Sequence, residues 1–159
     1  MIETVLRRLD ERGDNGSAVV EFVFLAVVLM IPVVYLVLSL GRVQEAAFAA
    51  EAVSRDVSRA AVVGGVDALQ EGSSYREAER AGRERAAAAL ATTLADFHVN
   101  PTDATVDLAC TADPCFTPGS DVTVAVTIDV ELPLIGAVLP QAHVTVSSSG
   151  SSPVDGYLP

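Results

Sequence analysis

The pattern of hydrophobic and polar positions divides the chain into an apolar first part, a helical middle and an alternating last part. Nineteen uncharged residues run from Phe22 to Leu40. At a rise of 1.5 Å per residue this run forms a helix of roughly 28 Å, close to the hydrocarbon thickness of about 30 Å. It is longer than the apolar core of a cleavable secretory signal, which has about 7–15 residues. The run therefore predicts a transmembrane helix over residues 17–41.

The same helix is predicted to continue beyond the membrane to about Val63. Small and apolar residues recur there at spacings of three and four, at Val43, Ala46, Ala50, Val53, Val57 and Ala60. This spacing makes a narrow seam on one helix face, which a partner helix could approach closely. Gly64-Gly65 is expected to end the helix, because glycine is common just after helix ends. Pro32 lies inside the apolar run and is expected to soften or kink it.

A second helix is predicted from Tyr75 to Phe97. Ser74 and Glu77 have the spacing of a capping box at its start. Opposite charges four residues apart, Glu79 with Arg83 and Arg80 with Glu84, are expected to pair on the solvated side of the helix.

After Asn100-Pro101 the period changes from 3.6 to two. Apolar and polar residues alternate over 106–110, 122–130 and 144–146, which predicts three strands with one apolar face each. The fold class is therefore α+β, with a long N-terminal helix, a second helix and a small antiparallel sheet.

Three further segments complete the predicted organisation. An α+β domain is expected over 42–146, and the Ser/Gly/Pro-rich residues 147–159 read as a flexible tail. The apolar connection from Leu132 to Pro140 could pack under the sheet or touch the membrane surface.

The charge of the chain narrows the choice of partners. The net charge is −11, and all ten basic residues are arginine. Residues 41–159 carry seven arginines against sixteen acids, so an acidic domain follows the apolar run. This argues against nucleic acid and anionic lipid as partners of that domain. Three arginines precede the span and three follow it closely, so the positive-inside rule favours a cytoplasmic N-terminus only weakly.

Cys110 and Cys115 are the only two cysteines and enclose Asp113-Pro114. A disulfide-closed turn is favoured over free thiols and over a metal site, because His98 and His143 are the only histidines available as further ligands. A disulfide would place this part of the chain outside the cytoplasm. No phosphate loop, nucleophile elbow or metal-ligand spacing is present, so the sequence predicts no enzyme, catalytic residue, metal or cofactor.

The start of the apolar run carries the main functional signal. The sequence reads Gly16-Ser17-Ala-Val-Val-Glu21-Phe22, after polar and charged residues 1–16. A carboxylate at the start of a membrane span costs free energy, so a functional role for it is expected. The alternative without an assembly role is that Glu21 simply lies in the first turn of the helix, where the helix dipole favours a negative charge and the carboxylate still contacts water.

This arrangement resembles the processing site of TadE-like minor pilins, pseudopilins of tight-adherence type IV pilus systems. Gly41-Arg42, at the outer end of the apolar run, also fits that family. The resemblance implies a cytoplasmic leader over 1–16 and cleavage by a prepilin peptidase between Gly16 and Ser17. Without cleavage, 1–16 would be a flexible tail.

The resemblance also implies a role in pilus assembly. Glu21 would meet the new α-amine of a neighbouring subunit, with Phe22 beside it. The implied partners are other pilin-like subunits, the assembly platform and the lipid bilayer, with no nucleic acid. The protein would be a single-pass membrane protein with its C-terminus outside the cytoplasm. The alternative is an uncleaved membrane anchor that displays an extracytoplasmic binding module.

Overall fold

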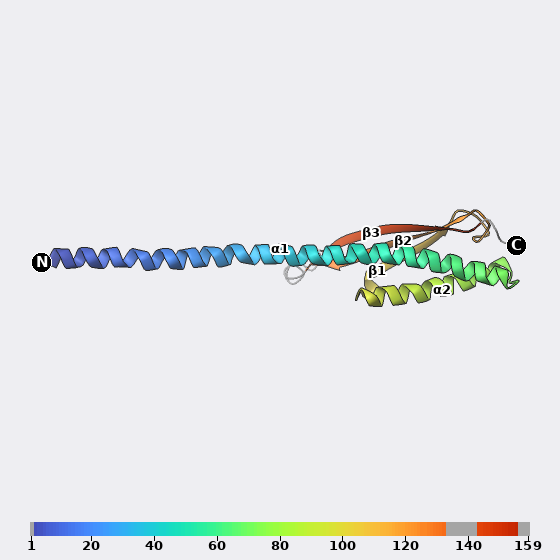
Figure 1. The fold of residues 1–159 in the computed structure, drawn as a ribbon, viewed down its shortest axis with the longest axis horizontal. Coiled ribbons are helices and arrows are strands. Elements are labelled where there is room, and N and C mark those ends of the chain that lie inside the picture. Colours follow the sequence, from blue (N-terminus) through green and yellow to red (C-terminus); the bar gives the residue numbers. More distant parts are fainter. Residues whose placement is uncertain (1, 133–142, 156–159) are drawn as a thin grey trace. The chain divides into compact units, whose positions relative to one another are not determined.

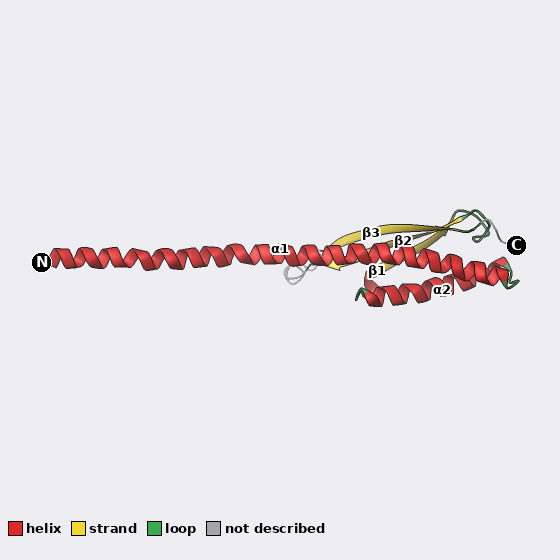
Figure 2. Cartoon of the chain, in the orientation of Figure 1, coloured by secondary structure: helices red, strands yellow, loops and turns green. Residues whose placement is uncertain are grey.

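The computed structural model describes residues 2–132 and 143–155, with side chains from Ala18 onward. Its elements in chain order are α1 (Ile2–Gln70), α2 (Tyr75–Asp96), the 3-10 helix η1 (Pro101–Asp103), β1 (Ala104–Cys110), β2 (Asp121–Glu131) and β3 (His143–Pro153) (Figures 1 and 2). The predicted α+β class, with a long N-terminal helix, a second helix and a small antiparallel sheet, is confirmed.

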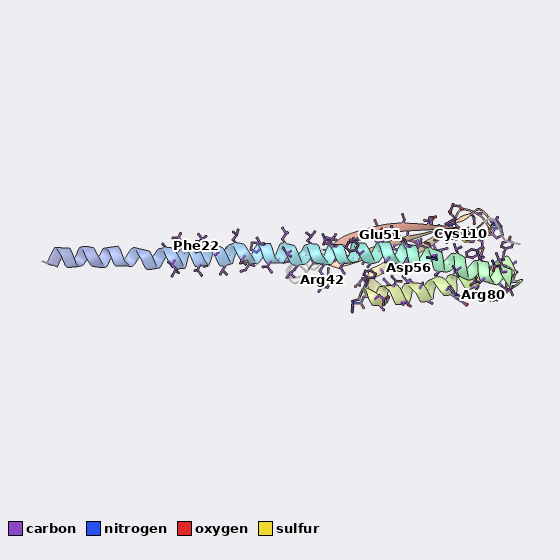
Figure 3. All side chains as sticks on the ribbon, viewed as in Figure 1. Phe22, Arg42, Glu51, Asp56, Arg80 and Cys110 are labelled. Carbon is purple, nitrogen blue, oxygen red and sulfur yellow. A yellow bond between two sulfur atoms is a disulfide. The ribbon has the colours of Figure 1, made fainter. Side chains whose placement is uncertain are left out.

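The chain divides into two compact units, residues 1–40 and residues 41–159. The first unit is helical from Ile2, so the predicted leader belongs to α1 from that residue on. The helix continues through Pro32 without interruption. Its large apolar side chains are exposed, including Phe22 at 72% and Leu29 at 69% (Figure 3). Within the described residues, the helix from Ala18 onward is the one long and apolar enough to cross a membrane.

In the second unit, α1 continues to Gln70, so the prediction that Gly64-Gly65 ends it is wrong. Both glycines are buried inside the helix. A Cβ atom at Gly65 would lie 2.5–2.6 Å from three ring atoms of Phe116. Close approach of that ring therefore explains glycine at Gly65. The helix ends instead at Gln70, and Gly72 in the turn just after it has a φ of +86°, which suits glycine.

The second helix, α2, matches its prediction closely. The carboxylate of Glu77 accepts hydrogen bonds from the backbone N–H of Ser74 at 2.8 Å and from its hydroxyl at 2.7 Å. These bonds fix the first turn, as the capping-box spacing predicted. The small residues Ala78, Gly82 and Ala86 are buried along one face.

The two ion pairs predicted on α2 do not form. The ion pairs among the described side chains are Arg55 with Glu51 at 2.5 Å and Arg85 with Asp67 at 4.0 Å. Glu79, expected to pair with Arg83, instead accepts the backbone N–H of Cys115 at 3.3 Å. Ion pairs between long side chains on a solvated helix face contribute little free energy, so a different hydrogen-bond partner can replace the paired residue.

The three strands form one antiparallel sheet in the order β1-β2-β3. Alternate residues of β2 are buried: Val122, Val124, Val126, Ile128 and Val130. They meet half-buried residues of the neighbouring strands in register, such as Val106 opposite Val126 and Val146 opposite Ile128. The predicted alternation with one apolar face is confirmed.

The interpretation of 147–159 as a flexible tail is wrong for Ser147–Pro153, which belong to β3 and pair with β2 along its length. Residues 156–159 lie outside the described residues. The inward positions of this stretch are small because α1 comes very close. A Cβ atom at Gly150 would lie 2.7 Å from the backbone of Ser54, and the hydroxyls of Ser58 and Ser152 lie 3.0 Å apart. A serine- and glycine-rich composition here reflects tight packing.

The small-residue seam of α1, which the spacing predicts as a surface for a partner helix, is covered by other segments of the same chain. Of its six predicted positions, four are buried, Ala46, Ala50, Val53 and Val57, and Val43 and Ala60 are half-buried. Ala49 and Ala61, which lie beside the seam, are also buried. Figure 1 shows β3 along one side of this part of α1 and α2 along the other. Thr93 of α2 donates a 3.4 Å hydrogen bond to Asp56 of α1. The apolar connection lies outside the described residues except for the half-buried Leu132.

Candidate functional site

The four residues of the predicted processing and assembly site lie within one continuous stretch of α1. Gly16 and Ser17 are helical, and only their backbone is described. Glu21 follows Ser17 by four residues, so both occupy the same face of the helix. The side chains of Glu21 and Phe22 are exposed.

Glu21 lies next to a long apolar surface. From Phe22 to Leu40 no charged residue follows it, and the large apolar side chains of this stretch are all exposed except the half-buried Tyr35. Neither ion pair among the described side chains involves Glu21. An isolated carboxylate is costly to bury in an apolar medium unless a cation accompanies it. The arrangement therefore favours a cationic partner if this helix enters an apolar assembly.

The cysteine turn is closed by a disulfide between Cys110 and Cys115, whose Cα atoms lie 5.3 Å apart. This resolves the choice among a disulfide, free thiols and a metal site. The turn also joins several elements. Ser120 donates its hydroxyl to the carbonyl of Cys115 at 2.8 Å, and the backbone of Val154 donates to Ser120 at 2.8 Å. Together with the Glu79 bond, these contacts fix the turn to α2 and to the end of β3.

Phe116 follows the disulfide and fills a socket between the two helices. Its side chain is only 2% exposed. Gly65 of α1 and Gly82 of α2 form the socket wall, and a Cβ atom on either would come within 2.6 Å of the ring. No prediction from the sequence included this contact. The glycine in each helix was the available signal, because glycine inside a helix is costly without a packing reason.

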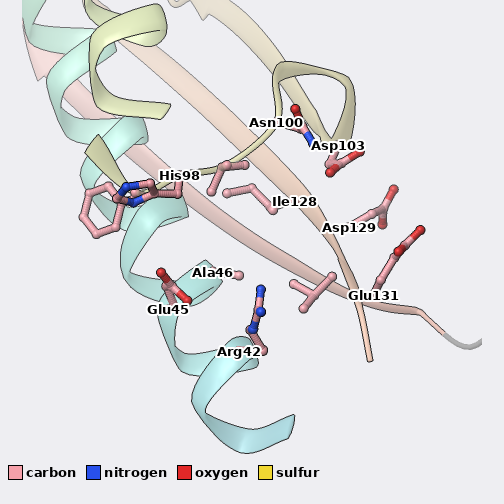
Figure 4. Close-up of a pocket in the computed structure, with 12 residues that line it drawn as sticks. Arg42, Glu45, Ala46, His98, Asn100, Asp103, Ile128, Asp129 and Glu131 are labelled. Atoms are coloured by element: carbon pink, nitrogen blue, oxygen red, sulfur yellow. The ribbon is translucent and has the colours of Figure 1, made fainter. Parts of the chain in front are cut away.

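A hollow of about 260 Å³ lies where three segments of the second unit meet (Figure 4). Its polar lining comes from the start of the domain, from the turn after α2 and from the end of β2, and consists of Arg42, Glu45, His98, Asn100, Asp103, Asp129 and Glu131. Its apolar lining includes Ala46, Ile128 and Val130. His98, two residues after the last residue of α2, has a φ of +54°.

Four acidic residues and one arginine line the hollow, but the carboxylate of Asp129 lies on the outer face of the sheet, where it accepts a 2.8 Å hydrogen bond from the hydroxyl of Thr145. No sequence pattern groups these residues, because only folding brings together segments that are 25 or more residues apart. No group of three metal-ligating side chains occurs within the described part of the chain.

Comparisons with family models, with curated proteins and with solved structures find no match for this chain.

Proposed function

We propose that this protein is a minor pilin-like structural subunit that takes part in assembling or initiating a tight-adherence pilus. The observation that carries the proposal is the position of Glu21. It is an exposed carboxylate five residues after Gly16, at the start of an exposed apolar helix of membrane length. The chain would be anchored in the cell membrane, with residues 1–16 in the cytoplasm and the disulfide-bearing domain outside.

The proposed mechanism begins with cleavage between Gly16 and Ser17 by a prepilin peptidase. Cleavage gives Ser17 a free α-amine on the helix face that also carries Glu21. In an assembled bundle, Glu21 of one subunit accepts hydrogen bonds from the α-amine of its neighbour. Two charges that are each costly in a low dielectric then offset one another, and a shift of one residue leaves both unpaired. The pair would therefore fix the register between subunits.

The rest of the chain fits a structural role. The Cys110–Cys115 disulfide favours an extracytoplasmic location for the second unit. The seam of α1 is already covered by the sheet and α2, so contacts between subunits would use the exposed first unit and the outer surfaces of the domain. The partners are the peptidase, other pilin-like subunits, the assembly platform and the lipid bilayer.

The second candidate is an uncleaved single-pass anchor that displays a binding module. The hollow of about 260 Å³ favours it, because pockets of this order accommodate small ligands or a partner's side chain. The mature N-terminus separates the two candidates. In the proposed function, protein extracted from membranes of cells with the cognate peptidase starts at Ser17. A chain that still starts at Met1 would favour the anchored module.

Two variants test the processing site. Gly16→Arg should block cleavage, because its side chain would clash in a peptidase site built for glycine. Gly13→Arg adds the same charge and bulk three residues earlier and should be cleaved normally. Equal processing of both variants would contradict the assignment of Gly16.

Glu21→Ala and Glu21→Gln test the assembly role. Each leaves the neighbour's α-amine without its partner, and breaking a buried pair costs on the order of 3–5 kcal/mol. Piliation should be lost while the amount of subunit in the membrane is preserved. Glu51→Gln is the matched control, because Glu51 forms only a solvent-exposed pair with Arg55. Normal piliation with Glu21→Ala at native expression would refute the proposed role of this residue.

A further inference from the structure

The charges of the second unit are unevenly distributed along the chain. All seven of its arginines lie between Arg42 and Arg85. Residues 86–159 carry eight acids and neither arginine nor lysine. Positive charge is therefore confined to the helices, and the sheet and its connections are purely acidic apart from two histidines.

The outer face of the sheet is an acidic surface. Because side chains alternate across strands, the residues that do not face the core share this outer face. Four of them are acids, Asp107, Asp121, Asp129 and Glu131, and the others are Thr, Ser, Ala, Pro153 and His143. Asp107, Asp129 and Glu131 are exposed and Asp121 is half-buried.

The first half of α2 carries a complementary stripe formed by Arg76, Arg80 and Arg83. Their spacing of four and three places them on one face of the helix, and all three are exposed. Figure 3 labels Arg80 on α2. None belongs to the two ion pairs found among the described side chains. The nearby carboxylate of Glu77 is already engaged by Ser74.

We propose that the arginine stripe of one copy docks on the acidic outer face of the sheet in a second copy. The dimensions match. Arg76 and Arg83 are seven residues apart, about 10.5 Å along a helix. Asp107 lies opposite Ala125, four residues from Asp129, which is about 13 Å along a strand. Flexible arginine side chains span the small difference, and arginine binds carboxylates in a two-pronged geometry.

Charge complementarity selects a second copy as the occupant. Both surfaces belong to the same chain and have opposite sign. The net negative charge of each domain repels the other at long range, but about 0.15 M salt screens charges beyond roughly 8 Å, so the contacting charges decide. The two surfaces differ, so the contact is heterologous and leaves a free stripe at one end and a free sheet at the other. Such contacts form open chains unless a ring closes.

The absence of lysine permits a direct test on the full-length protein in detergent micelles. Arg80→Lys keeps the charge and introduces the only amine other than the N-terminus. Carbodiimide then couples this amine to any carboxylate it contacts, and mixing isotopically light and heavy protein identifies bonds between copies. We expect bonds to Asp107 or Asp129 of the other copy. Arg59→Lys, an exposed position on α1 outside the stripe, should not give them.

Charge reversal provides a second, independent test. Reversing the stripe with Arg76→Glu, Arg80→Glu and Arg83→Glu should weaken self-association at least tenfold, and so should Asp107→Lys with Asp129→Lys. Mixing the two variants should restore association, because each supplies the charge that the other lacks. Far-UV circular dichroism checks that both remain folded, as expected for exposed positions.

Several outcomes would overturn the docking proposal. These are coupling of the new amine only to Glu77 or Glu84 of its own helix, association that is unchanged by reversal, or a mixture that does not associate. Binding of the stripe to vesicles containing anionic lipid, without coupling between copies, would identify lipid as the occupant instead. Both tests are repeated with Glu21→Ala, in which the cross-link between domains should persist. Failure of the pilin proposal therefore remains distinguishable from failure of this one.

Discussion

Substitution of Gly65 by alanine should destabilise the native chain but stabilise a variant that lacks the Phe116 ring. In the native chain, the new Cβ atom would lie 2.5–2.6 Å from three atoms of the Phe116 ring. Overpacking of this kind typically costs about 1–3 kcal/mol. The gain in helix propensity from glycine to alanine offsets about 1 kcal/mol. We therefore expect Gly65→Ala alone to lower the free energy of unfolding by up to about 2 kcal/mol.

Removal of the ring reverses this balance. Phe116→Ala alone should cost about 3–5 kcal/mol, because the ring is 2% exposed and fills the space between the helices. In that background the methyl group of Gly65→Ala enters the vacated space. Only the gain in helix propensity then remains, so the double variant should be about 1 kcal/mol more stable than Phe116→Ala.

Two other glycines serve as controls. A Cβ atom at Gly82 would also lie 2.8 Å from the backbone oxygen of Ala61, which the loss of Phe116 does not remove. Gly82→Ala should therefore destabilise both backgrounds. A methyl group added at Gly41 would meet no atom within 4 Å, so Gly41→Ala should be neutral or slightly stabilising in both. Urea unfolding of the full chain in micelles, followed by circular dichroism, measures all these variants. An equal effect of Gly65→Ala in both backgrounds would refute the socket.

Three further predictions concern the sheet, the turn and the start of α2. Gly150→Ala should lower the free energy of unfolding by about 1–3 kcal/mol, because the methyl group would overlap the α1 backbone; an unchanged urea midpoint would contradict that close approach. Thiol labelling of denatured, non-reduced protein should find no free thiol at Cys110 or Cys115, and reduction should destabilise the chain by about 2 kcal/mol. The hydroxyl and then the backbone N–H of Ser74 lower the pKa of Glu77 below its ordinary value of 4.5. The stability from this bond is present above that value and is lost as the pH falls through the lower folded-state pKa. Glu77→Gln should therefore reduce the loss of stability between pH 7 and pH 3. An unchanged loss would count against the bond.

Elements whose signals are local could be predicted from the amino-acid sequence. The apolar run after Glu21 sets the length of the exposed helix, because hydrophobic length is a property of consecutive residues. The box at Ser74 and Glu77 fixes the start of α2 through bonds within one turn. Alternation over 122–130 predicted the buried face of β2, because side chains on a strand repeat every two residues.

The roles of the small residues, in contrast, follow from long-range packing. Gly65 and Gly150 look like a helix terminator and part of a loose tail when read locally, yet each is small because another segment approaches within contact distance. The size of the space at a residue depends on a partner far along the chain, which no local pattern encodes. The same holds for the acidic outer face of the sheet and for the hollow lined by Arg42 and Asp103, since folding alone brings these residues together. Consecutive residues specify periodicity and length, whereas close approach and charge clustering arise from long-range packing.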